Sequence, residues 1–261
     1  MLGPPIHDPR ENHLLGALPE RDYARLAGEL ECVALVPGTL LNAPGAPFEF
    51  AYFPTTAIVA LILGRDGGAS AELAMTGKDG LVGIQRVLGG VSTRFALTVQ
   101  SGGEAWRLRT EVIDRERDHG GDLQRLALCY AQALMTQMAH NIVCNRHHLV
   151  DRQLCRWLLS SLDLLPGNQV DVTQEVIARM LGVRREAVTE AAGKLQAEGL
   201  IRYRRGHIMV IDRVGLEVRA CECYRAVRED YERLFAAQAA SKCSSISCTL
   251  DTPRNSLMPR R

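Results

Sequence analysis

The sequence predicts an α+β chain in which an antiparallel β domain precedes a mainly helical region. Between residues 32 and 113, short apolar runs alternate with turns that contain Gly or Pro, a spacing typical of an antiparallel sandwich or barrel. Residues 122–149 contain neither Gly nor Pro, and their apolar side chains recur every three or four positions, which indicates one long amphipathic helix. Residues 150–237 combine further helical segments with one short pair of strands. At 261 residues, the chain is long enough for two domains.

The elements of the first domain follow from leucine spacing and turn signals. Leucines between residues 11 and 30 recur at helical spacing and predict short helices that break at Pro19. The segment Arg65-Asp66-Gly67-Gly68 joins two apolar runs and predicts a β-hairpin turn. Residues 1–13 are interpreted as an N-terminal extension, and the first domain as residues 14–121.

The overall charge and hydropathy exclude several classes of protein. The chain has 31 Lys and Arg against 30 Asp and Glu, a net charge of +1, so any attraction to nucleic acid must come from local basic patches. No apolar run approaches the roughly 20 residues that cross a bilayer, and the charged, Pro-rich start lacks the apolar core of a signal peptide. We therefore expect a cytoplasmic protein with no membrane partner, whose eight cysteines remain thiols.

The long helix at 122–149 carries two apolar faces. The first comprises Leu126, Tyr130, Leu134 and Met138. The second comprises Leu128, Ala131, Met135 and Ile142. One face suits the helix's own domain and the other a partner helix, so we expect a homodimer with the first face in the dimer seam. A helix buried wholly in its own domain is the alternative.

Residues 170–212 predict two helices joined by a tight turn and followed by a hairpin. Thr173 can cap the first helix with its hydroxyl, and the small Ala178 allows two helices to cross closely. Gly182 supplies the backbone freedom that the turn requires, so the second helix spans about 184–197. Together these features predict a helix-turn-helix, whose second helix enters the major groove of DNA.

The predicted DNA contacts gather at the start of the second helix and on the hairpin after it. Arginine can bond bidentately to guanine and a carboxylate can accept from cytosine, so Arg185 beside Glu186 has base-reading chemistry; a surface salt bridge is the alternative. The hairpin carries a run of basic residues with no acid, which indicates a wing that reaches phosphate or the minor groove; a solvated basic hairpin is the alternative. The predicted set is Thr173, Gln174, Arg184, Arg185, Glu186, Thr189, Lys194, Arg204 and Arg205.

Over residues 14–235 the sequence resembles the Crp/Fnr family of transcription regulators. The most specific stretch is TQEVIARMLGVRREAVTEAAGKLQAEGLIRYRRG at 173–206, and a subgroup of the family has segments similar to CNRHHLVDRQLCRWLL and ACECY. The resemblance implies a cyclic-nucleotide-binding-like β-roll at 14–121, a dimerisation helix at 122–149 and a winged helix-turn-helix at 150–237. It also implies that Arg185 and Glu186 read bases. The Ser-rich residues 238–261 are predicted to form a disordered tail.

The resemblance also bears on the ligand of the roll. Relatives that bind cyclic AMP hold its ribose with a Glu and its phosphate with an Arg and a small hydroxyl residue. Here Arg94 matches, but Ile84 replaces the Glu and Phe95 replaces the hydroxyl residue, so buried polar groups of the nucleotide would lack partners. We expect no cyclic AMP binding, and either an unknown small-molecule effector near Arg94 or DNA binding without any effector.

No cofactor or metal is predicted. An iron-sulfur centre of the Fnr type needs several closely spaced N-terminal cysteines, and this region has only Cys32. A metal hypothesis is available for one group of residues, which comprises Cys144, His147, His148 and Cys155. On a continuous helix Cys144, His148 and Cys155 could line up as three ligands, but no fourth ligand is identifiable, so packing or hinge roles are favoured. Residues two apart on a helix diverge, so Cys221 and Cys223 are also assigned structural roles.

These patterns predict a dimeric, sequence-specific DNA-binding regulator whose partner is a palindromic operator in double-stranded DNA, with RNA polymerase as a further candidate partner. Motifs of common enzyme classes are absent, so an enzyme is not predicted. The first alternative is a small-molecule sensor whose winged domain binds a protein or only non-specific nucleic acid, and a chromatin-like architectural role is a second.

Overall fold

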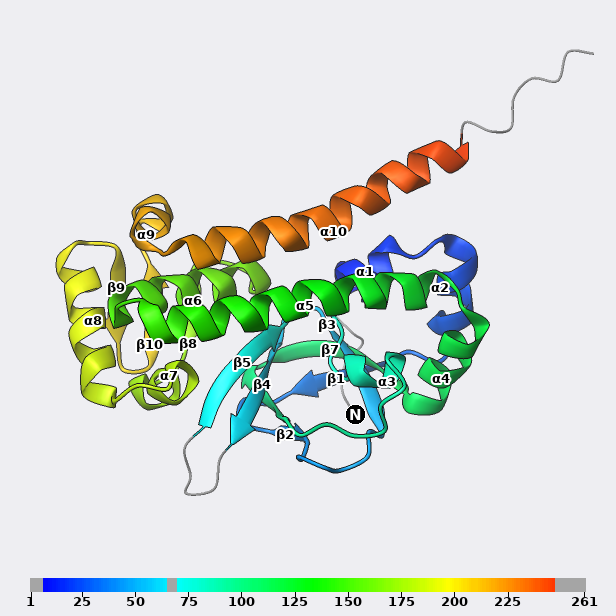
Figure 1. Ribbon diagram of the computed structural model, residues 1–261, viewed down its shortest axis with the longest axis horizontal. Helices are drawn as coiled ribbons and strands as arrows, with labels where there is room; N and C mark the ends of the chain where they lie inside the picture. The colour runs from blue at the N-terminus through cyan, green and yellow to red at the C-terminus, as the bar shows by residue number, and fades with distance from the viewer. Residues whose placement is uncertain (1–6, 65–69, 247–261) are drawn as a thin grey trace, which may run out of the picture.

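The structure of the chain is a computed structural model that describes residues 7–64 and 70–246 (Figure 1). A β-roll lies against the long helix α5 (Asp122–His147), and a second long helix, α10 (Glu222–Ile246), runs beside α5. The helix-turn-helix region occupies one end of the molecule, and the N-terminal helices occupy the other end.

The N-terminal segment forms the short helices that the leucine spacing predicts. They are η1 (Pro9–Glu11), α1 (His13–Ala17) and α2 (Glu20–Ala27). The side chain of Asn12 caps α1 by accepting from the amides of Leu14 and Leu15. Pro19 precedes the first residue of α2, and the predicted break at this position is confirmed.

The roll consists of two antiparallel sheets. One has the strand order β1 (Glu31–Leu35), β7 (Gly103–Arg109), β3 (Phe50–Pro54). The other has the order β2 (Leu40–Asn42), β6 (Ala96–Ser101), β4 (Ile58–Gly64), β5 (Ser70–Thr76). Gly102 passes the chain from β6 to β7, and therefore from one sheet to the other. The predicted turn at 65–68 lies outside the described residues, but β4 and β5 pair antiparallel on either side of it.

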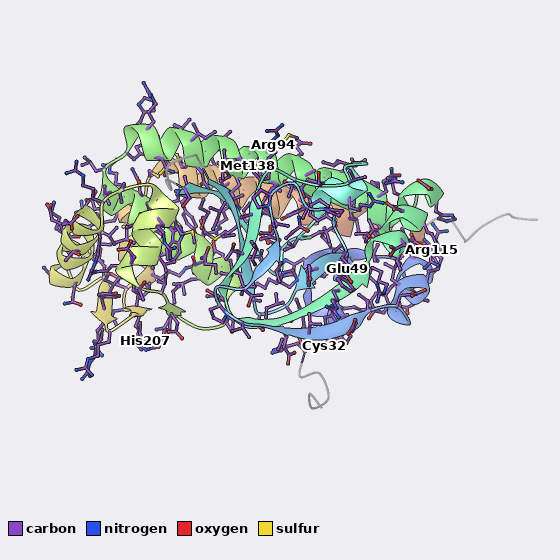
Figure 2. All side chains as sticks on the ribbon, turned by 90° about the horizontal axis from the view of Figure 1, so that it is seen from below. Cys32, Glu49, Arg94, Arg115, Met138 and His207 are labelled. Carbon is purple, nitrogen blue, oxygen red and sulfur yellow. The ribbon has the colours of Figure 1, made fainter. Side chains whose placement is uncertain are left out.

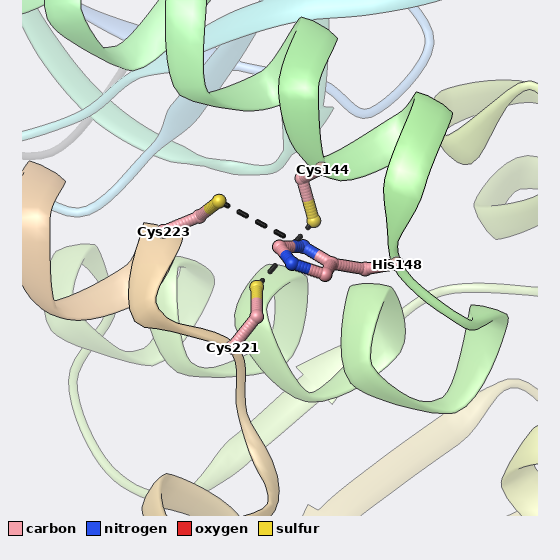
Figure 3. A group of neighbouring side chains, drawn as sticks. All are labelled: Cys144, His148, Cys221 and Cys223. Carbon is pink, nitrogen blue, oxygen red and sulfur yellow. Dashed lines mark hydrogen bonds between the residues drawn. The ribbon is translucent and has the colours of Figure 1, made fainter.

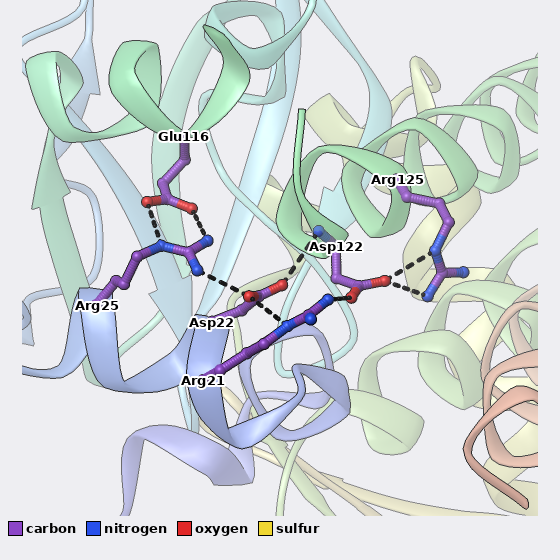
Figure 4. A network of polar contacts seen from close by, with 6 residues as sticks. All are labelled: Arg21, Asp22, Arg25, Glu116, Asp122 and Arg125. Carbon is purple, nitrogen blue, oxygen red and sulfur yellow. Dashed lines mark hydrogen bonds and ion pairs between the residues drawn. The ribbon is translucent and has the colours of Figure 1, made fainter. Parts of the chain in front are cut away.

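Two short helices complete the roll, and a polar network connects it to α5. They are α3 (Ile84–Val87) and α4 (Thr110–His119). Arg25 of α2 donates to both carboxylate oxygens of Glu116 on α4, at 3.2 and 2.8 Å, and to Asp22 at 2.8 Å (Figure 4). Asp22 in turn accepts from the amide of Asp122, the first residue of α5. Burial alone would raise the pKa of Asp22, but the hydrogen bonds from Arg25 and this amide hold it below its ordinary value. The network therefore fixes where α5 begins.

The assignment of the first apolar face of α5 to a dimer seam is wrong. Leu126, Tyr130 and Leu134 are 0–4% exposed and pack in the core of the roll, and the Tyr130 hydroxyl lies 2.7 Å from the Thr76 hydroxyl on β5. Met138 packs partly against the same core. These side chains pack against the chain's own roll and against α10, because both present apolar surface to α5. The exposed apolar residues of α5 belong mainly to the second predicted face.

The region after α5 has its own apolar core. Its elements are α6 (Val150–Leu164), β8 (Gln169–Asp171), α7 (Gln174–Leu181), α8 (Arg185–Ala197), β9 (Ile201–Arg204), β10 (His207–Val210) and α9 (Arg213–Arg219). Trp157, Ile177 and Leu195 are fully buried in this core. The predicted pair of strands is present, and the unpredicted β8 adds to it in the order β8-β10-β9.

Helix α10 extends beyond its predicted end. We expected the helix to stop at residue 237 and a disordered tail to occupy 238–261, whereas α10 continues to Ile246. Residues 236–240 read AAQAA, and the strong helix propensity of Ala explains the continuation. Residues 247–261 lie outside the described residues. Among the helices of the described ranges, none has the length and apolar character needed to cross a membrane.

Candidate nucleic-acid interface

The first helix of the predicted helix-turn-helix begins and ends where its sequence signals indicate. Thr173 precedes α7, and its Oγ1 accepts from the amide of Val176 at 3.3 Å. Gly182 follows α7 with φ of +68°, a left-handed conformation that glycine adopts without a steric penalty. The predicted cap and turn are confirmed.

A small core holds α7 and α8 at a fixed crossing. Ile177, Leu181 and Val188 are at most 2% exposed, and Val183 packs partly against them. The amide of Val183 donates to the carbonyl of Ala178 at 3.0 Å, which closes the turn. The start of α8 is thereby held rigidly on the outside of this region.

The first turn of α8 presents polar side chains to solvent. Arg184, which precedes the helix, is exposed, as are Arg185 and Glu186. Within the described part of the chain, none of these three side chains forms an ion pair, so the alternative of a surface Arg–Glu salt bridge finds no support. A guanidinium and a carboxylate without protein partners remain available for another molecule.

The other residues predicted on these helices are only partly brought together. Gln174, at the start of α7, accepts a hydrogen bond of 2.9 Å from the hydroxyl of Thr189 on α8. Lys194 is exposed but lies two turns further along α8, where it pairs with Glu190 at 2.7 Å. The structure thus groups Gln174 and Thr189 with the first turn of α8, whereas Lys194 lies apart.

The wing is a hairpin with a two-residue turn. Arg205 and Gly206 have φ of +48° and +87°, so the turn has left-handed conformations at both central positions, as in a type I′ turn. Arg204 and Arg205 are exposed. The amide of Tyr203 donates to Gln196 on α8 at 2.9 Å, which ties the wing to the second helix. The basic side chains of the wing and the start of α8 therefore belong to one connected unit.

A groove of about 620 Å³ separates this unit from the roll. Its walls include Ser70 and Gln100 of the roll, and Thr173 and Arg205 of the helix-turn-helix and wing. The first residues of α8 do not line it. Thr173 and Arg205 thus border the roll, while Arg184 and Arg185 do not.

The predicted ligand-binding residue of the roll is at the surface. Arg94 is exposed, and Figure 2 shows it on the opposite side of the molecule from His207 of the wing. Ile84 is 3% exposed in the core, and Phe95 packs partly against the same core. A cavity of about 250 Å³ in the roll is lined by residues 40–43, 46–50, 52 and 97, without Arg94. Position 84 therefore offers no acceptor for a ribose.

The structure brings together a different set of cysteines and histidines from the one considered above. Cys144, His148, Cys221 and Cys223 converge, whereas Cys155 is not part of this group (Figure 3). Helix α10 begins at Glu222, so Cys221 precedes the helix, and the argument that the two cysteines diverge on a helix does not hold. The hydrogen bond from Cys144 holds the pKa of the Cys221 thiol below its ordinary value.

These features define a class of protein in which a β-roll is joined through a long helix to a winged helix-turn-helix. Residues 152–219 match the family model of the Crp-like helix-turn-helix domain. No curated protein sequence matches the chain. The predicted winged helix-turn-helix is therefore supported independently of its geometry.

Solved structures extend the similarity to the whole fold. A putative transcriptional regulator of the Crp/Fnr family from Eubacterium rectale is 16% identical, with 79% of this chain and 96% of that chain covered at a TM-score of 0.61. FixK2 from Bradyrhizobium japonicum is 14% identical, with 74% and 98% covered at a TM-score of 0.64. A transcriptional regulator of the CRP/FNR family from Thermus thermophilus is 21% identical, with 73% and 98% covered at a TM-score of 0.56. The predicted fold class and the resemblance to the Crp/Fnr regulators are confirmed.

Proposed function

We propose that the chain is a dimeric, sequence-specific DNA-binding transcription regulator that places the start of α8 in the major groove. The observation that carries this proposal is the exposed, unpaired set of Arg184, Arg185 and Glu186 on a helix held by a buried core. Side chains at the N-terminal end of a recognition helix meet base edges, and Arg with Glu can distinguish guanine and cytosine.

The remaining predicted residues take positioning roles. Gln174 and Thr189 lie beside the first turn of α8, which carries the proposed base-reading residues. Thr173, Arg204 and Arg205 are exposed, as is Lys194 two turns further along α8, and they contact phosphate groups, which fix the register of the protein on the duplex without reading sequence.

The homodimer uses the exposed residues of the second apolar face of α5; Ala131, which was predicted on this face, is 8% exposed and packs in the core instead. Leu128, Met135 and Ile142 are 48%, 63% and 61% exposed and recur every seven residues, the repeat of a coiled-coil seam. The exposed Gln132 and Ala139 lie between them, each four residues after an apolar member of this face. Two copies paired along this face bind the two halves of a palindromic operator about 34 Å apart. Since such a partner is chromosomal, the protein acts in the cytoplasm, and RNA polymerase is a candidate partner at the promoter.

The regulator binds its operator without cyclic AMP. The buried Ile84 and the partly buried Phe95 leave the nucleotide's ribose and phosphate without the partners that a Glu and a hydroxyl residue would supply. Arg94 remains the proposed contact for an effector, which would be anionic. The protein acts through binding and catalyses no reaction.

Measuring affinity for operator and random DNA in parallel tests this function. A sequence-specific regulator should bind its selected site at least about 10³-fold more tightly than random DNA at the same salt concentration. The alternatives, a sensor with a protein partner or an architectural protein, predict a ratio near one. Adding cyclic AMP should leave the ratio unchanged, and binding of cyclic AMP that raises operator affinity would contradict the interpretation of the roll.

A further inference from the structure

Four metal-ligating side chains from distant parts of the sequence meet where α5 ends and α10 begins (Figure 3). Cys144 lies in the last turn of α5 and His148 follows that helix, whereas Cys221 and Cys223 flank Glu222, the first residue of α10. One ligand atom from each residue lies within 4.8 Å of the other three. The three cysteines are at most 4% exposed, and His148 is half-buried. Three thiols and an imidazole are the donors that zinc prefers.

The spacing of these atoms fits a single ion. The Sγ atoms of Cys144 and Cys221 are 3.5 Å apart, and Cys223 Sγ is 3.8 Å from His148 Nδ1. A tetrahedral ion with Zn–S bonds of about 2.3 Å holds two sulfurs about 3.8 Å apart. An iron-sulfur cluster needs more room, because its ligands bind to different iron atoms.

The second nitrogen of the imidazole is already oriented. His148 Nε2 lies 3.3 Å from a carboxylate oxygen of Glu222. A carboxylate on the far nitrogen is the usual partner of a metal-bound histidine, because it fixes the ring orientation and leaves the other nitrogen free as a ligand. Here that other nitrogen is Nδ1, which faces Cys223.

A buried cation stands beside the thiols. Arg156 is 4% exposed, and its guanidinium donates to Cys144 Sγ at 3.2 Å and to Asn141 at 2.6 Å. Within the described residues, no carboxylate oxygen lies within 4.0 Å of it. Arg156 acts electrostatically on the buried Glu72 carboxyl but forms no ion pair with it, and a buried cation without a directly paired counter-charge is unfavourable. Three thiolates around a divalent cation carry one net negative charge, which Arg156 would neutralise.

We propose that Cys144, His148, Cys221 and Cys223 bind one Zn²⁺ ion in a closed tetrahedral site. Four protein ligands leave no open coordination position, so the ion is structural. Residues 149–220, which lie between the two ligand pairs, contain the whole helix-turn-helix and wing. The ion therefore joins the entry and the exit of that region and anchors both to the end of α5. Binding releases the thiol protons to solvent, so affinity falls at low pH.

Titration of the full-length chain with Co²⁺ tests the site without any mutation. The chain is purified under reducing conditions, stripped of metal and titrated anaerobically. Tetrahedral thiolate coordination should give Co²⁺ intense visible d–d bands that saturate at one ion per chain and disappear on addition of one equivalent of Zn²⁺. Absence of these bands in the folded chain would overturn the proposal, as would an iron-sulfur spectrum in the protein as purified.

Matched variants then test the ligand set. Cys223→Ser should lose the thiolate bands or bind Co²⁺ far more weakly, whereas Cys155→Ser removes a buried cysteine outside the group and should keep one ion per chain. Glu222→Gln should retain the ion with about tenfold weaker affinity. Loss of the ion in Cys155→Ser but not in Cys223→Ser would contradict the assignment. Should Cys223→Ser fail to fold, a rise in the melting temperature of the metal-free wild type on adding Zn²⁺ supports the site, and no rise contradicts it.

Discussion

The hydroxyl of Thr189 lies 2.9 Å from Gln174 Oε1 and 3.1 Å from the carbonyl of Arg185, one turn earlier on α8. Thr189 thus shares a face of α8 with Arg185 and also meets the first residue of α7. Both Thr189 and Arg185 are exposed. Both helices of the helix-turn-helix present polar groups on this face. We expect this face to meet base edges.

The first prediction separates base reading from phosphate contact. Arg185→Ala should weaken operator binding by about 1–3 kcal/mol and relax the preference at one base pair in each half-site. Arg204→Ala should weaken operator and random DNA to a similar extent and lower the salt slope by about one. Affinities measured over a range of salt concentrations provide the comparison. An unchanged sequence preference in Arg185→Ala would contradict the orientation of α8.

The second prediction concerns two adjacent residues of α5. Met135 is 63% exposed and Leu134 is 4% exposed. Met135→Asp should therefore give a folded monomer with little operator affinity, because it places a charge in the dimer seam without touching the monomer's core. Leu134→Asp should instead lower the free energy of unfolding by several kcal/mol, because it buries a charge. Sedimentation and thermal unfolding of both variants test this, and a dimeric Met135→Asp would place the interface elsewhere.

The third prediction uses the turn of the wing. A side chain in the left-handed region costs about 1 kcal/mol, and Asn tolerates it better than Arg. Since Arg205 has φ of +48°, Arg205→Asn should raise the free energy of unfolding by about 0.5–1 kcal/mol while weakening all DNA binding. Arg204→Asn is the matched control, since it removes the same charge from an extended strand and should not stabilise the chain. Equal stabilities of the two variants in urea unfolding would argue against the strain.

The fourth prediction is a dependence of stability on pH. Glu72 lies on β5 of the roll, is 3% exposed and accepts a hydrogen bond from Trp157 of α6. Burial raises the pKa of Glu72 from about 4.5 to about 7, although Arg156 and the hydrogen bond from Trp157 both lower it. The folded chain binds this proton more tightly than the unfolded chain, so the wild type should lose stability as the pH rises from about 4.5 to about 7.

Glu72→Gln removes this titration. The variant should match the wild type near pH 4 and exceed it above pH 7, by on the order of 3 kcal/mol. Urea unfolding at both pH values gives the difference. A variant less stable than the wild type at the higher pH would show that the ionised carboxylate makes a favourable contact.

The sequence predicts the helix-turn-helix well because all its signals are local. The cap of Thr173 and the turn at Gly182 each depend on a few neighbouring residues, and the structure has them where the sequence indicates. The basic hairpin is also predicted from neighbouring residues, and the structure places its turn at Arg205 and Gly206. The wing's third strand, β8, could not be predicted because it spans only three residues.

Features that depend on tertiary contacts were not predictable in the same way. Periodicity finds two apolar faces on α5 but cannot tell which one meets the roll, and that choice depends on contacts such as Tyr130 with Thr76 on β5. Cys144 and Cys221 are 77 residues apart, and no local spacing brings them together. The loop between α9 and α10 does so by directing Cys221 toward the end of α5.

Selection of binding sites from random DNA by the purified full-length chain tests the central claim most directly. We predict that the wild type enriches a palindromic motif with half-sites about 34 Å apart, without cyclic AMP. The Arg185→Ala variant should enrich a motif whose base preference is relaxed at one position in each half-site. Recovery of no motif by a folded wild type, or of the same motif with equal enrichment by Arg185→Ala, would contradict it.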